Sequence, residues 1–107
     1  MLSLFLLAFA AAPAAAPNTA AIDRNRAAYR ACLATAAAAA KPPAVTADKF
    51  AEFVHAQCAA QQAALTEAMI SFDMRNGASR KAAADGATMA VEDYVETAKN
   101  SWAARNP

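Results

Sequence analysis

The strongest helical pattern in the chain is TADKFAEFVHAQCAAQQAALTEAMISFDMRNG, residues 46–77. Apolar side chains recur in it every three or four residues, which is the spacing of one face of an α-helix. These side chains are Phe50, Val54, Cys58, Leu65, Met69 and Phe72. Thr46 is positioned to cap the start of the helix, and Gly77 can end it because glycine accepts the left-handed conformation that follows a helix. We therefore predict one long amphipathic helix between Thr46 and Asn76.

Helical segments flank this one on both sides. Residues 19–40 contain neither glycine nor proline and end just before Pro42-Pro43, a pair that cannot continue a helix. Residues 79–104 form a third helical region, in which one face carries a set of larger apolar side chains. This set is Val91, Tyr94, Val95, Ala98 and Trp102. The dipeptide Asp85-Gly86 either breaks the third region or only weakens it.

Cys32 and Cys58 are the only cysteines in the chain, so they allow a single intramolecular disulfide. It would close a loop of about 27 residues and contribute roughly 3.5 kcal/mol on a chain-entropy estimate. On two antiparallel helices joined at Pro42-Pro43, the two cysteines would differ by only about 5 Å in height. The alternatives are two free thiols, an intermolecular bridge or a metal site, for which His55 alone adds too few ligands. We predict the Cys32–Cys58 bridge.

The expected fold class is all-α: a disulfide-linked helical hairpin with a third C-terminal helix, forming a small three-helix bundle. The hydrophobic content of 58% overstates the core. About a third of the chain is alanine, which forms helices well but buries little area. A small domain with so few large apolar side chains gains from a covalent cross-link.

The first twenty residues have the pattern of a secretory signal peptide. They are strongly apolar up to Ala12 and contain no charged side chain. This run is shorter than the roughly 20 residues that span a bilayer. Small residues follow it, and they suit cleavage after Ala14 or after Ala21. We predict a signal peptide over residues 1–21, cleaved between about 14 and 21, and a single small helical domain over residues 22–107. An uncleaved N-terminal anchor is the alternative; after cleavage no stable membrane span is expected.

The sequence offers no set of side chains with the pattern of a catalytic site. His55 and Cys58 share a helix face, but a disulfide would consume the thiolate that a thiol–imidazole pair needs. Glu92, Asp93 and Glu96 lie close in sequence, yet the chain has too few histidines for a di-metal helical bundle. We expect these carboxylates to be solvated, and we expect no enzymatic activity, no cofactor and no metal.

Net charge and composition limit the classes of partner. With a formal net charge of +1, nucleic acid is not an obvious partner. We expect a non-enzymatic exported protein of the cell envelope, periplasmic or extracellular, that acts through contacts with a protein partner, as a chaperone or an accessory subunit. The alternative is a binding module for a hydrophobic ligand or lipid between alanine-rich helices. A cavity lined by Phe50, Val54, Leu65 and Trp102 would favour that alternative.

The signal peptide gives a first testable prediction: the mature protein begins between Ala15 and Ile22. Signal peptidase cuts after small residues that follow a short apolar run, and this stretch provides them. N-terminal sequencing of the protein from an envelope fraction measures the new terminus. An intact Met1 in that fraction would contradict the prediction.

Overall fold

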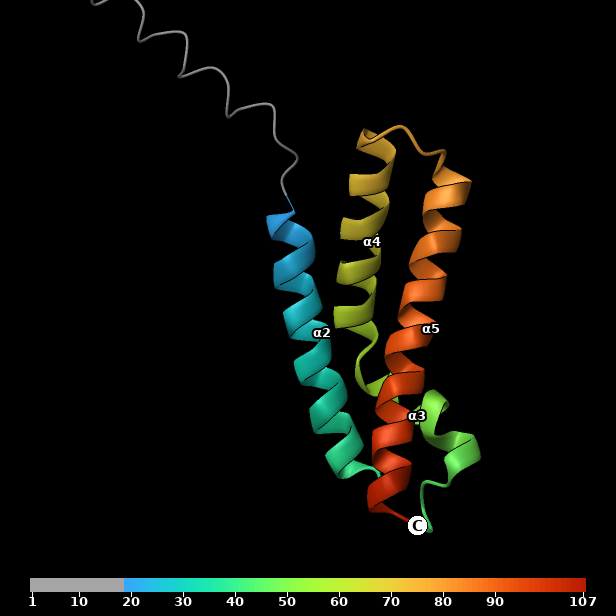
Figure 1. Ribbon diagram of the computed structural model, residues 1–107. Helices are drawn as coiled ribbons and strands as arrows, with labels where there is room; N and C mark the ends of the chain where they lie inside the picture. Colours follow the sequence, from blue (N-terminus) through green and yellow to red (C-terminus); the bar gives the residue numbers. More distant parts are fainter. Residues whose placement is uncertain (1–18) are drawn as a thin grey trace, which may run out of the picture.

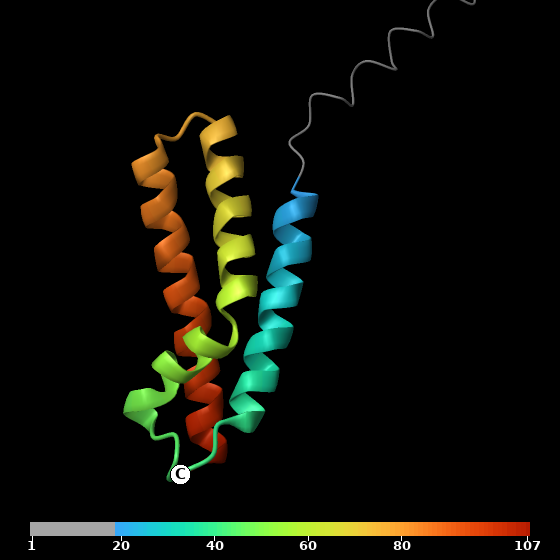
Figure 2. The same cartoon turned by 180° about the vertical axis from the view of Figure 1, so that it is seen from behind.

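Helices make up every regular element of residues 19–107, the part of the chain that the computed structural model describes. Helix α2 spans Ala20–Ala39, the 3₁₀ turn η3 spans Ala47–Lys49, α3 spans Phe50–Gln57, α4 spans Ala59–Arg75 and α5 spans Arg80–Arg105. Helix α4 runs antiparallel to both α2 and α5, and the short α3 crosses the end of the bundle where α2 and α5 finish (Figures 1 and 2). The predicted all-α bundle with a C-terminal third helix is confirmed. Residues 1–18, which contain most of the predicted signal peptide, lie outside the described residues.

The disulfide links α2 to the junction between α3 and α4. Cys32 and Cys58 are bonded, with Cα atoms 5.9 Å apart, within the usual range for a disulfide. Cys58 is fully buried and Cys32 is half-buried. The sequence-based prediction of this bridge is confirmed.

The segment predicted as one helix between Thr46 and Asn76 is divided, so the prediction was wrong on this point. Thr46 makes no side-chain capping bond, a 3₁₀ turn precedes α3, and the helix is interrupted at Cys58, where φ is −115° and ψ is 23°. No glycine or proline lies at the interruption to cause it. The bend turns α3 across α5, so that Phe50 reaches Trp102 while α4 continues beside α2. Tertiary packing therefore overrides the helical pattern here.

The turn between α4 and α5 follows the sequence-based expectation. Gly77 has a φ of 101°, in the left-handed region that favours glycine. Its N–H donates to the Met74 carbonyl at 3.1 Å, and the Ala78 N–H donates to the Asp73 carbonyl at 2.9 Å. This pair of bonds satisfies carbonyls that the end of α4 leaves open. The Ser79 side chain then caps α5 by accepting a hydrogen bond from the Ala82 N–H at 3.1 Å.

Helix α5 runs unbroken through Asp85-Gly86, the dipeptide whose effect the sequence left open. Ala83 and Ala87, on either side of it, are buried in one cluster with Ile70 of α4. Asp85 also forms an ion pair with Lys81, one turn earlier in the helix, with 2.8 Å between the Lys81 nitrogen and the carboxylate oxygen. The helical cost of one glycine is about 1 kcal/mol, and this packing offsets it.

Trp102 closes the core at the end of the bundle opposite the α4–α5 turn. Its side chain is only 3% exposed, and its ring lies 5.1 Å from that of Phe50, centroid to centroid. Its indole N–H donates to the Ala40 carbonyl, just past the end of α2, at 2.9 Å. One side chain of α5 thus fixes both α3 and the end of α2. The same cluster includes the fully buried Tyr29 and Leu65.

Replacing Trp102 with Ala should lower the free energy of unfolding by about 3–5 kcal/mol, because it empties a buried aromatic site. Trp102→Phe keeps the contact with Phe50 but leaves the Ala40 carbonyl without its donor, and should cost about 1–3 kcal/mol. Urea denaturation of the three proteins tests this order. Met89→Ala is the control, because Met89 is 66% exposed and should change stability by less than about 0.5 kcal/mol. Equal losses for Trp102→Ala and Met89→Ala would contradict the packing.

Candidate functional site

The residues weighed as a thiol–imidazole pair do not form one. The Cys58 sulfur is in the disulfide, so no thiolate is available beside His55. His55 is half-buried, and its Nδ1 lies 2.7 Å from the side-chain oxygen of Gln62 across the bend in the helix. This hydrogen bond links α3 to α4, which is a structural role.

The acidic residues of α5 face solvent. Glu92, Asp93 and Glu96 are all exposed. In residues 19–107, no group of three or more His, Cys, Asp or Glu side chains is arranged to hold a metal ion. Nor does this part of the chain contain a helix long and apolar enough to cross a bilayer.

The four residues that were considered as the lining of a ligand cavity enclose no open space. Phe50, Val54 and Leu65 are each 0% exposed and pack with Trp102 in the main core. These four residues therefore hold the bundle together and do not line a space. The hollows of the surface lie elsewhere.

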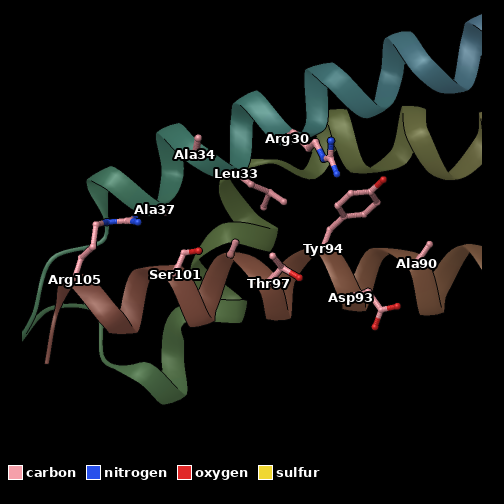
Figure 3. A pocket seen from close by; sticks show the side chains of 11 residues that line it. Arg30, Leu33, Ala34, Ala37, Ala90, Asp93, Tyr94, Thr97, Ser101 and Arg105 are labelled. Atoms are coloured by element: carbon pink, nitrogen blue, oxygen red, sulfur yellow. The ribbon is translucent and has the colours of Figure 1, made fainter.

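An open groove of about 520 Å³ runs between the parallel helices α2 and α5 (Figure 3). Leu33 of α2 and Tyr94 of α5 point into the space between the helices. Arg105 lies at one end of the groove, and Arg30 lies beside Tyr94, toward the other end. Most of the remaining wall is small side chains. The full lining is Arg30, Leu33, Ala34, Ala37, Ala90, Asp93, Tyr94, Thr97, Ala98, Ser101 and Arg105.

The α5 side of the groove has a polar edge. Asp93, Thr97, Ser101 and Arg105 follow one another at intervals of four residues, so they share one strip of the helix. All four are exposed, and the Asp93 carboxylate turns away from α2 (Figure 3). The groove thus combines an apolar floor with hydroxyl groups and charges along one edge.

The two arginines of the groove have no carboxylate partner among residues 19–107. Four ion pairs occur in that range, and neither Arg30 nor Arg105 belongs to any of them. The Arg30 guanidinium lies over the ring of Tyr94, 5.4 Å from its centroid, which is a cation–π contact. Both arginines are exposed and can accept an anionic group from outside.

A second hollow, of about 400 Å³, lies at the other end of the bundle. Ile22, Met69 and Phe72 line it and are half-buried. The basic group at its edge, Arg26, is already paired with Asp23 at 3.1 Å. This hollow therefore lacks the unpaired arginines that the groove offers to a ligand, and we take the groove as the candidate site.

Sequence reasoning missed the groove. The strip from Asp93 to Arg105 is visible as a four-residue repeat, but it is interpretable only once α2 is known to lie parallel beside α5. We found no protein-family model, no curated protein and no solved structure that matches the chain.

Tyr29 lies in the core next to the groove residue Tyr94, with ring centroids 5.9 Å apart in an edge-to-face contact. Its hydroxyl is buried and has no hydrogen-bond partner among residues 19–107. A buried polar group without a partner costs about 1–3 kcal/mol. Burial also raises the pKa of the Tyr29 hydroxyl above its usual value of 10.0.

Tyr29→Phe should therefore raise the free energy of unfolding by about 1 kcal/mol at neutral pH. Because the raised pKa belongs to the folded state, the wild-type protein should lose stability as pH rises above about 10, where the unfolded chain releases the proton first. The variant should lose less over that range. Urea denaturation at pH 8 and pH 10.5 measures both effects, with Tyr94→Phe as the control for a half-buried tyrosine. A destabilised Tyr29→Phe protein would mean that the hydroxyl has a partner.

Proposed function

We propose that the chain is a small, non-enzymatic, exported protein of the cell envelope, and that the groove between α2 and α5 binds a helix of a protein partner. The observation that carries the proposal is the open groove walled by alanines. Ala34, Ala37, Ala90 and Ala98 contribute only methyl groups. Side chains this small let a further helix approach two others closely.

The shape of the groove favours a helix over a small molecule. Small-molecule sites enclose most of the ligand surface and are lined largely by big apolar and aromatic side chains. This groove is open along its length, and only Leu33 and Tyr94 are large apolar residues. An elongated apolar floor with a polar edge is the kind of surface that takes the apolar face of an amphipathic helix.

Export is supported by the sequence and by the cross-link. The apolar N-terminal run has the pattern of a secretory signal. The Cys32–Cys58 disulfide is of a kind that persists in oxidising compartments such as the periplasm and the cell exterior. Together they favour a location in the envelope or outside the cell.

A hydrophobic ligand or lipid is the second candidate occupant. The volume of about 520 Å³ lies within the range of small-ligand sites, and Leu33 and Tyr94 give the floor some apolar area. Arg30 or Arg105 would then face an anionic head group.

Site-specific photo-crosslinking in the native cells separates these candidates. A photoreactive residue in place of Thr97, on the groove edge, should give an adduct larger by the mass of a protein. The same residue in place of Ala64, exposed on α4, is the matched control and should give none. Ala34→Phe, which fills the groove, should abolish the Thr97 adduct, whereas Ala64→Phe should not. A lipid adduct, or protein adducts of equal yield from both positions, would reject the proposal.

A further inference from the structure

The outward face of α5 carries a pattern that matches the groove. Asp85, Met89, Glu92 and Glu96 lie at intervals of four, three and four residues, so they form one strip of the helix. We call these four residues the acidic strip. All four are exposed, and Met89 is the most exposed of the large hydrophobic side chains in residues 19–107. The strip lies on a different side of α5 from the groove residues.

The spacing of charges agrees between the two surfaces. Arg30 lies over Tyr94, so it marks the level of Tyr94 along α5. From Tyr94 to Arg105 is eleven residues, or about 16 Å of helix. From Asp85 to Glu96 is also eleven residues, about three turns, so the two carboxylates point to the same side. A helix laid along the groove in either direction could therefore bring one carboxylate to each arginine.

The apolar residues between the charged groups of the two surfaces are also complementary. Between its carboxylates the acidic strip presents Met89, an unbranched side chain that adapts to irregular apolar surfaces. Between its arginines the groove presents Leu33, Ala37 and Ala98. Contact with this floor would remove from water a side chain that is 66% exposed in the isolated protein.

The net charges of the two surfaces have opposite sign. The groove carries Arg30, Arg105 and one carboxylate, Asp93, which leaves it at +1. The acidic strip has three carboxylates and is flanked by Lys81, bonded to Asp85, and by Lys99, which leaves it at −1. The attraction is therefore favourable but modest, because all these groups are near solvent.

We propose that the helix bound in the groove is α5 of a second copy of this chain, presented through the acidic strip. This inference rests on the proposed function, since it names the partner of the same groove. Each molecule carries one groove and one acidic strip on different sides, so the contact joins unlike surfaces. Such an interface produces rings or open chains and is not limited to dimers.

Sedimentation velocity of the purified mature protein tests the inference. The wild-type protein should associate beyond the dimer as its concentration rises toward about 1 mM, because an interface of one helix in one groove is small. Association should weaken at high ionic strength. A protein that stays monomeric up to that concentration would overturn the inference.

Charge-reversal variants test whether the groove and the acidic strip are the two surfaces that meet. Arg30→Glu with Arg105→Glu, and separately Asp85→Arg with Glu96→Arg, should each weaken self-association by about three- to tenfold. Mixing the two double variants should restore association, because each then meets a surface of opposite charge. Arg24→Glu with Arg75→Glu is the matched control: both residues are exposed, unpaired among residues 19–107 and outside the groove, and should change nothing. Circular dichroism confirms that each variant folds.

The possible failures are distinguishable. Loss of association in the control pair, or no recovery on mixing, would show that the groove and the acidic strip do not meet. A monomeric protein whose Thr97 position still crosslinks to a different protein would overturn the self-association and leave the proposed function standing. If Thr97 gives no protein adduct in cells and the purified protein is also monomeric, both the self-association and the proposed function are overturned.

Discussion

The disulfide at the bend of the second helical segment is the constraint on which the arrangement of the bundle depends. Cys58 lies between α3 and α4, and its bond to Cys32 fixes that junction against the middle of α2. From this fixed point α4 runs beside α2, while α3 turns away to cover the end of the bundle. A core with so few large side chains would define this bend poorly without a covalent link.

The sequence predicts where the helices lie but not where the second helical segment bends. Helix ends were predictable where local chemistry decides them, as at Gly77 and at the prolines after α2. The interruption at Cys58 was not, because it goes with contacts between residues far apart in the chain: the disulfide to Cys32 and the packing of Phe50 on Trp102. Continuity through Gly86 likewise depends on the burial of its alanine neighbours against α4. The groove was invisible for the same reason: its two walls come from helices whose adjacency no local pattern encodes.

Alanine has two opposite effects in this protein. It favours the helices, yet it contributes little buried area, so the core depends on a few residues such as Tyr29, Phe50, Leu65 and Trp102. Between α2 and α5 only Leu33 and Tyr94 are large apolar side chains, and the alanines around them leave a groove. The composition that makes the core thin is thus also what leaves a surface for docking.

The contact of Trp102 with Ala40 has a consequence for the order in which the fold is completed. Trp102 and Ala40 are 62 residues apart in the chain, whereas Cys32 and Cys58 are separated by 26. Contacts between distant residues form more slowly than local ones, and a chain emerges from the ribosome or a translocon N-terminus first. Both cysteines therefore emerge before Trp102, and Phe50 has no ring partner until α5 has been made. The core closes only when Trp102 reaches Phe50 and the Ala40 carbonyl.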